Sequence, residues 1–437
     1  MNRLIDRNSD SAISMPIPAS AGKPSWKVLV IHQNFPGQFR NLVLDLARDP
    51  DCQVLAVGKQ GCPGMSGVRT YTYKLHRRPA PGTHHYVKPF EAGILHGQAV
   101  LRLLLALKNK GFSPDVIVAH PGWGETLFVE DVFPQARLIH FSEYYYHAAG
   151  ADAGFDPEFP ASLDDIARIR SKNALMLLNL ENCDVAVAPT PWQKSLHPLP
   201  YQEKIVLLHE GVDTDYLQPD PSANFVLPNG KILQPGDEVL TYVARNLEPY
   251  RGFHTFMRAV PDILRQRPDC HIVIVGGDDV SYGSKPKDVP NWREKMLLEV
   301  TFDVGRVHFL GRIPYPAYRS LLQVSAVHVY LTYPFVLSWS MLEAMACGCL
   351  LIASDTAPVR DVVRNGENGL LTDFFDASAL ARKVVAVLRE PSRFEKIRRA
   401  GVLTVRRDYP TKRGTAGYRQ LIGIDKNDVV ASSSHVI

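Results

Sequence analysis

The chain has 437 residues, of which 45% are hydrophobic and 22% are charged, and its formal net charge is +4. This composition is typical of a folded globular protein and excludes an intrinsically disordered one. The length is sufficient for two domains of ordinary size. The small and dispersed net charge gives no indication of a nucleic-acid partner.

The cysteines favour a cytoplasmic protein, and both chain ends are expected to lie outside the folded domains. Six cysteines are scattered without a CxxC pair or a Cys/His group at zinc spacing, so we expect reduced thiols and no structural metal. Residues 1–25 lack an apolar h-region and are interpreted as a disordered leader, and residues 426–437 as a disordered tail. The apolar segment 99–111 contains Arg102 and is too short to span a bilayer, so we expect a core helix there.

Strand-like and helix-like segments alternate from residue 26 onward. Short apolar strands separated by helices predict a parallel sheet with helices on both faces. Strands are expected at 26–33, 52–58, 115–120, 136–141, 184–189 and 204–211, and helices at 38–49, 91–110 and 161–180.

The alternation restarts after a connector at 218–237 that is rich in Pro, Asn and Gly. Strands are expected at 238–244, 270–277, 306–311, 326–332, 349–354 and 369–374, with a helix at 252–266. The predicted fold is α/β, with two Rossmann-like, doubly wound parallel-sheet domains that face a central cleft. We expect an acceptor domain at 26–217, a donor domain at 218–408 and a C-terminal helix at 409–425 that packs back on the first domain.

Three loops of the first half carry candidate site residues, because ligands bind at the carboxyl ends of parallel strands. NFPGQFR places Gly37 at the opening of a helix, where backbone N–H groups could receive a phosphate or a sugar hydroxyl. HPGWGETLF offers His120 and Trp123 for sugar binding, the alternative being that Trp123 fills the core. HFSEYYYH adds Glu143 beside three tyrosines, which fits either a carbohydrate site or an aromatic cluster beneath the cleft.

Two arginines of the second half are candidates for holding a diphosphate. Arg245 follows a strand and Arg251 opens the next helix, where the helix dipole disfavours a surface arginine. Two converging cations would neutralise a pyrophosphate leaving group. In PFVLSWSMLEAMACG we expect a helix at 336–347 with an apolar face at Leu337, Met341 and Leu342, and Glu343 as a buried acid that needs a partner.

Two further charged patterns have a structural interpretation, which is the only one adopted for the first. Asp213 and Asp215 have DxD spacing, and Asp278 and Asp279 follow a strand, but aspartates are common in turns, so no catalytic metal is expected. Near the C-terminus a basic cluster either contacts phosphate or anionic lipid, the latter at the inner face of the cytoplasmic membrane, or is a solvated helix face. It comprises Arg398, Arg399, Arg406, Arg407, Lys412 and Arg413.

The motifs taken together resemble the retaining family 4 glycosyltransferases of GT-B architecture over about residues 26–420. They are EGVD (210–213), RNLEPYRG (245–252), IVIVGG (272–277), VHFLGRIPY (307–315), LEAMACG (342–348) and DVVRNGENGLL (361–371). Together with HQNFPGQFR and HPGWGETLF they resemble a bacterial subgroup linked to surface-polysaccharide assembly.

The resemblance implies roles for single residues. Arg245 and Arg251 would hold the donor diphosphate and Glu343 the nucleotide ribose, with Gly37 and Gly211 also in the donor site and Arg312 and Ile313 framing the base. Family members carry a second acid eight residues before Glu343, where this chain has Phe335. Backbone around Val336–Trp339, including Ser338 and Trp339, would contact the sugar instead. The histidine that contacts the transferred sugar has no clean counterpart; His140 lies near its position, and we favour His120 and Glu143.

The implied activity is transfer of a hexose from a nucleoside-diphosphate sugar, UDP or GDP, to a saccharide or lipid-linked saccharide. No carboxylate pair for double displacement is identifiable from the sequence, so a front-face mechanism without a metal is expected, in which the departing phosphate takes the acceptor proton. A nucleotide-sugar epimerase or hydrolase of the same fold is one alternative. A non-catalytic nucleotide-sugar-binding subunit of a polysaccharide complex is the other.

Overall fold

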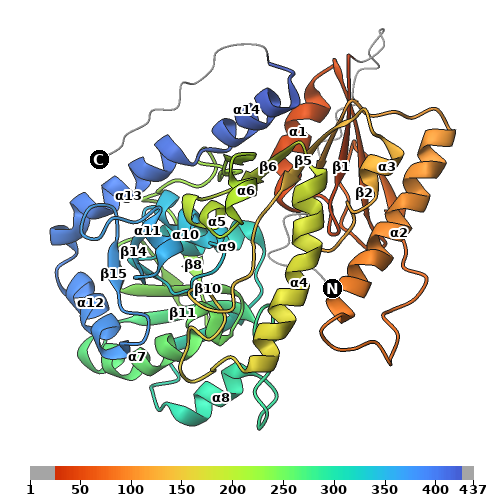
Figure 1. Ribbon diagram of the computed structural model, residues 1–437. Helices are drawn as coiled ribbons and strands as arrows, with labels where there is room; N and C mark the ends of the chain where they lie inside the picture. Colours follow the sequence, from red (N-terminus) through yellow and green to blue (C-terminus); the bar gives the residue numbers. More distant parts are fainter. Residues whose placement is uncertain (1–24, 426–437) are drawn as a thin grey trace.

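The computed structural model describes residues 25–425 and shows two α/β lobes (Figure 1). Of the predicted leader at 1–25 the structure describes Ser25, and residues 1–24 and the predicted tail at 426–437 lie outside the described residues. All six cysteines are free.

The first lobe is built on a seven-stranded sheet in the order β3-β2-β1-β4-β5-β6-β7. Neighbouring strands are parallel throughout. The order reverses between β1 and β4, which is where ligands bind in open parallel sheets. The strands are β1 (Trp26–Ile31), β2 (Cys52–Lys59), β3 (Arg69–Tyr73), β4 (Val116–Ala119), β5 (Arg137–Phe141), β6 (Val185–Ala188) and β7 (Ile205–Leu207).

Three long helices cover this sheet. They are α1 (Arg40–Arg48), α2 (Lys88–Asn109) and α4 (Leu163–Asn182), and shorter turns are η1 (Gly37–Phe39), α3 (Val129–Val132), α5 (Pro191–Ser195) and α6 (Leu199–Gln202). By length and composition alone, α2 could cross a membrane, so the expectation that this helix is too short was wrong. One side of it is nevertheless buried against the sheet through Val100, Leu104 and Leu107, which makes it a core helix.

The second lobe repeats the design with a six-stranded parallel sheet in the order β12-β11-β10-β13-β14-β15. Its strands are β10 (Val239–Asn246), β11 (His271–Gly277), β12 (Val307–Gly311), β13 (Val327–Tyr330), β14 (Leu350–Ser354) and β15 (Leu370–Thr372), and the connector holds a hairpin of β8 (Phe225–Val226) and β9 (Ile232–Leu233). The helices are η2 (Pro249–Arg251), α7 (Phe253–Gln266), α8 (Trp292–Glu299), α9 (Tyr315–Val324), α10 (Trp339–Ala346), α11 (Ala357–Arg360), α12 (Ala377–Arg389), η3 (Pro391–Phe394) and α13 (Glu395–Asp408). The predicted pair of doubly wound parallel sheets is confirmed.

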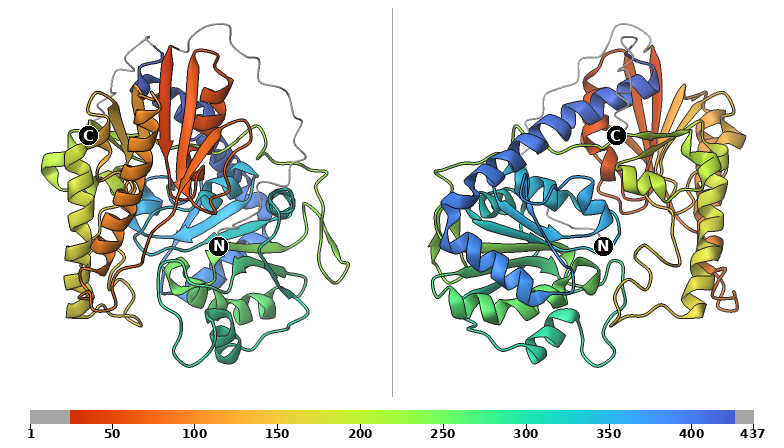
Figure 2. Two further views of the ribbon diagram at one scale, coloured as in Figure 1. Left: turned by 90° about the vertical axis from the view of Figure 1, so that its right-hand side faces the viewer. Right: turned by 60° about the vertical axis from the view of Figure 1, so that its left-hand side comes forward.

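The last helix, α14 (Thr411–Ile422), crosses from the second lobe to the first, as the right-hand view of Figure 2 shows. Arg419 forms ion pairs with Asp45 and Asp49 at α1, and Tyr418 is buried in the core of the first lobe. At the crossing, Gly211 has a φ of +78°, and a Cβ there would lie 2.7 Å from the backbone of Pro410. Gly211 is therefore required by the close approach of two chain segments.

A second segment crosses in the opposite direction. Residues 151–159, which we call the strap, leave β5 and dock on the second lobe before α4 begins. Phe155 packs on Tyr333 and Phe374 at centroid distances of 5.2 and 5.3 Å. The Asp156 carboxylate accepts a hydrogen bond of 2.7 Å from the Tyr333 hydroxyl and lies 3.0 Å from His254 Nε2. Burial raises the pKa of Asp156, but the contacts with His254 and Tyr333 outweigh this effect and lower it.

Candidate active site

His120 and Glu143 meet where β4 and β5 end. His120 Nε2 lies 3.6 Å from Glu143 Oε2, and the Glu143 side chain is 33% exposed. A backbone N–H of Gly122 donates to His120 Nδ1 at 3.1 Å, and the Trp123 ring stacks on the imidazole at 4.5 Å. The structure thus brings two sequence-predicted residues together, and it gives Trp123 the role of supporting His120. His140 is buried beneath them, with Nδ1 3.1 Å from the carbonyl of Asn179.

The loop after β1 contributes a further side chain to the same place. Gln38 Nε2 donates to Glu143 Oε1 at 3.3 Å, and its Oε1 lies 2.7 Å from His32 Nε2. Gly37 has a φ of +50°, and a Cβ on it would lie 2.3 Å from the His32 ring. A glycine is therefore required at position 37 by the packing of the His32 ring against it. The predicted approach of Gly37 to the donor stays a prediction.

Arg245 faces this group from the second lobe. It is exposed at the carboxyl end of β10, and its charge is one of the influences that lower the pKa of Glu143. The largest influence on Glu143 is burial, which raises the pKa, but the hydrogen bonds and charges of its neighbours outweigh it. Among residues 25–425, no carboxylate lies within ion-pair distance of Arg245, so its charge is available to an anionic ligand.

Arg251 is buried, so the dipole argument, which concerns a surface arginine at a helix start, does not apply to it. It is 6% exposed, and its Nη1 donates to the Tyr330 hydroxyl, to Thr332 Oγ1 and to the carbonyl of Val336 at 3.0, 2.8 and 3.0 Å. These three hydrogen bonds satisfy the buried guanidinium within the protein. The position of Arg251 at a helix start therefore does not by itself imply a ligand. The same contacts hold the loop before α10 in position.

The two guanidinium groups converge on one aromatic ring. Arg245 Cζ lies 5.9 Å and Arg251 Cζ 5.2 Å from the centroid of Tyr282, which are cation–π distances. Glu248 holds the Tyr282 loop, because its buried carboxylate accepts the backbone N–H groups of Ser281, Tyr282 and Gly283 at 2.9–3.1 Å. The two arginines therefore meet at an anchored loop that sequence reasoning missed, and their convergence on a diphosphate stays a prediction.

Phe335, the residue at the position of the missing acid, belongs to an aromatic cluster between the lobes. Its ring lies 4.7 Å from Tyr144 of the first lobe and 4.9 Å from Tyr282 of the second. Asp152 of the strap accepts hydrogen bonds from the Tyr144 and Tyr250 hydroxyls at 2.8 and 3.0 Å. One carboxylate thus ties aromatic residues of both lobes together at this end of the cleft.

Glu343 is buried on α10, with 3% of its surface exposed. The hydroxyls of Tyr315 and Tyr318 donate to its two oxygens at 3.0 and 2.9 Å. The expected partner for this buried acid is therefore present on α9. The helix itself begins at Trp339 and not at 336, which leaves Leu337 outside it.

The remaining predicted donor residues lie on neighbouring segments. Arg312 follows β12 and donates to Asn246 Oδ1 at 3.1 Å, and Ile313 is partly buried beside it. The backbone N–H of Ser338 donates to the Tyr330 hydroxyl at 2.8 Å. Trp339 Nε1 donates to Glu210 Oε1 at 2.5 Å, which connects α10 to the EGVD segment.

The acids that sequence analysis assigned to turns have protein partners. Asp213 accepts the backbone N–H groups of Asp215 and Tyr216, as expected for a turn aspartate. Asp215 pairs with Lys412, Asp278 with Arg293 and Asp279 with Arg312. A separate group of Asp156, Glu158 and His254 has ligand atoms within 4.8 Å of one another, but Arg258 is paired with Glu158, and a cation opposes metal binding there.

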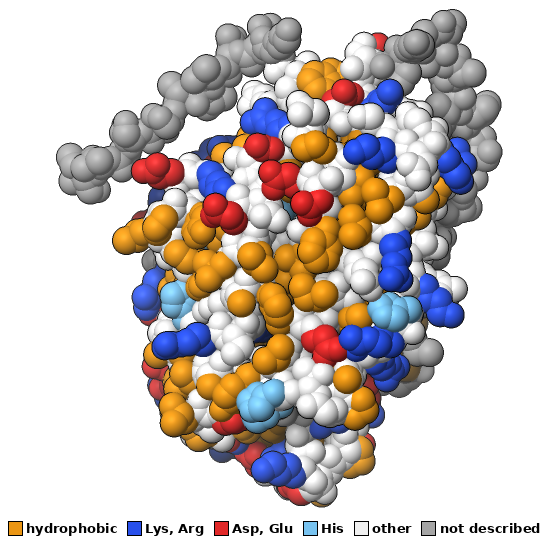
Figure 3. Space-filling view, turned by 45° about the vertical axis from the view of Figure 1, so that its right-hand side comes forward, with side chains coloured by type: hydrophobic (Ala, Val, Ile, Leu, Met, Phe, Trp, Pro, Cys, Tyr) orange, Lys and Arg blue, Asp and Glu red, His pale blue; other side chains and the backbone are white. Residues whose placement is uncertain are grey.

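The basic cluster of the C-terminal helices is largely neutralised. Arg398 and Arg399 pair with Glu395, and Arg407 and Arg413 pair with Asp408. These pairs favour the solvated helix face over a lipid-binding surface. Apolar side chains instead gather in a band on the side that carries α2 and α4 (Figure 3). Exposed leucines on these helices are Leu105 of α2 and Leu163 and Leu178 of α4, which are 44%, 81% and 43% exposed.

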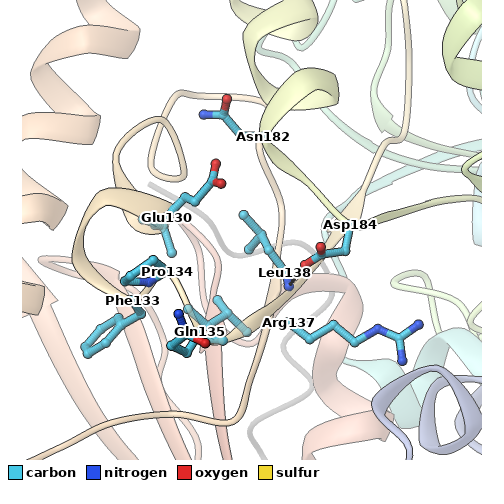
Figure 4. Close-up of a pocket in the computed structure, with 11 residues that line it drawn as sticks. Glu130, Phe133, Pro134, Gln135, Arg137, Leu138, Asn182 and Asp184 are labelled. Atoms are coloured by element: carbon cyan, nitrogen blue, oxygen red, sulfur yellow. Dashed lines mark hydrogen bonds between the residues drawn. The ribbon is translucent and has the colours of Figure 1, made fainter.

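A hollow of about 320 Å³ lies near the amino ends of β4 and β5, away from the carboxyl ends that carry the candidate site (Figure 4). Its lining includes Glu130 of α3, Phe133 directly after it, Arg137 and Leu138 at the start of β5, and Asp184. Asp184 is engaged there, since it accepts the backbone N–H of Leu138 at 2.7 Å. This hollow is separate from the strand ends that carry His120 and Glu143.

Two family profiles match consecutive parts of the chain. The profile described as Glycosyl transferase family 4 group matches residues 50–217, and the one described as Glycosyl transferases group 1 matches residues 229–402. The two matches correspond to the two lobes.

Curated relatives match over part of their length. A GDP-mannose-dependent alpha-(1-6)-phosphatidylinositol monomannoside mannosyltransferase from Mycolicibacterium smegmatis is 28% identical over 43% of this chain and 47% of its own. A D-inositol 3-phosphate glycosyltransferase from Acidothermus cellulolyticus is 25% identical over 50% of this chain and 51% of its own. The chain thus spans about half the length of these relatives.

Solved structures match over nearly the whole chain. Sucrose-phosphate synthase from Thermosynechococcus elongatus has a TM-score of 0.67 at 18% identity, and it covers 92% of this chain and 100% of its own. Anabaena HepE, solved in complex with UDP-glucose, has a TM-score of 0.64 at 14% identity with the same coverage. At these identities the likeness concerns the fold.

Proposed function

Because this chain belongs to the family 4 glycosyltransferases of GT-B architecture, we propose that it transfers a hexose from a nucleoside-diphosphate sugar to a saccharide or lipid-linked saccharide. One observation carries the proposal: Arg245 and Arg251 converge on the Tyr282 ring, opposite the Glu143 carboxylate of the other lobe. Cations that hold a departing diphosphate, with an acid on the far side of the sugar, are the groups that such a transfer needs.

The proposed mechanism is retaining and needs no metal. Arg245 and Arg251 would neutralise the charge that grows on the diphosphate as the glycosyl bond breaks, and this phosphate would take the acceptor proton. Glu143, held by His120 and Gln38, would face the positive charge that develops on the sugar. Closure of the lobes would exclude water, which competes with the acceptor.

UDP or GDP is the proposed nucleotide, with its ribose on Glu343. Relatives whose names include GDP-mannose and a neighbour solved with UDP-glucose support this choice. The exposed apolar band on α2 and α4 supports a lipid-linked acceptor and peripheral contact with the cytoplasmic membrane. A role in surface-polysaccharide assembly is part of the same proposal.

A screen of UDP-, GDP- and dTDP-sugars by thermal shift tests donor binding, since a ligand at 100 times its Kd stabilises by about 2.7 kcal/mol. We expect one nucleotide class to stabilise the protein and to support transfer, with the anomeric configuration of the product followed by NMR. Stabilisation by no donor would refute the proposal, and an inverted product would refute the retaining mechanism.

The packed aromatic cluster around Phe335 favours one alternative, a non-catalytic nucleotide-sugar-binding subunit. Phe335 and Tyr144 are both nearly buried in it, at the position where the family resemblance implies an acid directed toward the sugar. Donor binding without turnover, over a wide set of saccharide acceptors, would support this alternative. Release of free sugar without an acceptor would instead indicate a hydrolase.

A further inference from the structure

The motif HQNFPGQFR is only partly explained by donor binding. In the structure it folds so that the His32 ring covers Gly37, where any Cβ would lie 2.3 Å from the imidazole. The turn directs the next side chain, Gln38, to Glu143 Oε1 at 3.3 Å. His32, Gly37 and Gln38 thus form one local structure. It places the Gln38 amide in a hydrogen bond with the Glu143 carboxylate, 105 residues later in the chain.

The hydrogen bonds of this local structure have a fixed direction. The backbone N–H of Asn34 donates to His32 Nδ1 at 3.0 Å, so in the neutral ring the proton resides on Nε2. His32 Nε2 then donates to Gln38 Oε1 at 2.7 Å, and the amide orientation this imposes leaves Gln38 Nε2 as a donor to Glu143. Glu143 is therefore required to accept.

A parallel arrangement directs a second nitrogen toward the same carboxylate, at ion-pair distance and not within a hydrogen bond. The backbone N–H of Gly122 donates to His120 Nδ1 at 3.1 Å, which places the proton of the neutral ring on Nε2. That nitrogen lies 3.6 Å from Glu143 Oε2. A Cβ on Gly122 would lie 2.7 Å from the His120 ring, so this motif repeats the pattern of a glycine beneath an imidazole.

The charged and titratable groups around Glu143 come from several elements. His120 and His32 belong to the first lobe, as does Tyr146 on the same loop, and Arg245 belongs to the second. Gln193 Nε2 donates to the Glu143 backbone carbonyl at 2.6 Å, which fixes the backbone. Burial, assisted by His120, lowers the pKa of His32 to about 3, so this ring stays neutral and keeps its donor direction at neutral pH.

We propose that Gln38 and His32 are positioning residues that hold Glu143 as an ionised, acceptor-only carboxylate directed into the cleft. The inference rests on the proposed transferase function, in which Glu143 contacts the transferred sugar. An ionised carboxylate stabilises the positive charge that develops there, whereas a protonated one would not. A carboxylate that receives fixed donors stays ionised at lower pH.

The decisive variant is Gln38→Glu, which has nearly the same shape but sets a second carboxylate against Glu143. Two adjacent carboxylates share a proton, which raises one pKa strongly. We expect the acid limb of the kcat–pH profile to move upward by about one unit or more, with activity recovering at high pH and with little change in the donor KM. Gln38→Leu, the second variant, should move the limb in the same direction by a smaller amount.

Gln33→Glu is the matched control. Gln33 lies in the same loop and donates to a different carboxylate, that of Glu125, at 3.3 Å, which is completely buried. We expect the profile of this variant to coincide with that of the wild type. We call the hydrogen bonds from His32 through Gln38 to Glu143 the relay. A uniform loss of kcat across pH in Gln38→Glu, or the same shift in Gln33→Glu, would overturn its proposed role.

Nitrogen-15 NMR of the histidine rings in the full chain tests the relay without any turnover. The His32 signal, assigned by its loss in His32→Gln, should show a protonated Nε2 and a bare Nδ1 that do not titrate between pH 8 and about 5. The opposite tautomer would refute the relay even in an active enzyme. Absence of transfer with every donor, with the expected tautomer present, would refute the proposed function and leave the relay standing.

Discussion

Replacement of Arg245 by Ala isolates the charge that the site offers to the diphosphate. The side chain is exposed at the end of β10, and no carboxylate of residues 25–425 pairs with it. Its loss should therefore change the free energy of unfolding by no more than about 0.5 kcal/mol, as for surface substitutions in general. Loss of one transition-state charge contact costs about 10²–10³ in kcat, or roughly 2.7–4 kcal/mol.

The assay combines urea unfolding with transfer kinetics on the preferred donor. We expect Arg245→Ala to unfold at the wild-type urea midpoint while kcat falls by about two orders of magnitude or more. Arg102→Ala, an exposed arginine on α2, is the control and should affect neither quantity. Wild-type kcat in Arg245→Ala, with the fold intact, would refute the assignment of this residue to the leaving group.

Other perturbations separate structural from chemical roles. Arg251→Ala removes a buried donor to three oxygens and should lower the free energy of unfolding by about 3–5 kcal/mol as well as abolish transfer; an unchanged urea midpoint would contradict the role of its hydrogen bonds. Glu343→Gln should raise KM for the donor and weaken free nucleoside diphosphate in titration calorimetry, with kcat changed much less; equal nucleotide affinity would make Glu343 purely structural. Transfer should survive EDTA, and a loss reversed by manganese would restore Asp213 and Asp278 as metal ligands. Burial lowers the pKa of His32 and of His328 from 6.5 to about 3. As the pH falls, each ring is therefore protonated in the unfolded chain before it is protonated in the folded protein. The stability they contribute is complete above pH 6.5 and is lost as the pH falls toward 3, at up to about 1.4 kcal/mol per pH unit for each ring. His328→Gln should flatten the pH dependence of the urea midpoint, and an unchanged slope would contradict it.

Most of the two sheets could be predicted, because the central strands are buried on both faces and read as continuous apolar segments. β3 was missed because it is not a central strand and is not buried on both faces. Its sequence RTYTY lies at the sheet edge, where Tyr73 is the one buried residue of the five, and it lacks an apolar run. The hairpin of β8 and β9 is too short to be recognised within a connector rich in Pro and Gly.

The candidate site was predictable where one residue follows one strand, as with Arg245, His120 and Glu143. Partners across long sequence distances were not. The burial of Arg251 depends on Tyr330, Thr332 and Val336, about 80 residues later, so a local argument from the helix dipole failed. Gln38 stood in a recognised motif, but a single sequence gives no sign that its amide meets Glu143.

The strap and α14 exchange chain segments between the lobes, so each hydrophobic core is completed from the opposite half. Phe155 of the first lobe packs with the core of the second, while Tyr418 and Ile422 fill the core of the first. A chimera that takes its donor lobe from a relative, in order to change the sugar transferred, cannot be joined at the connector alone. The strap must come with the lobe on which it docks, and α14 must stay with the lobe that it covers.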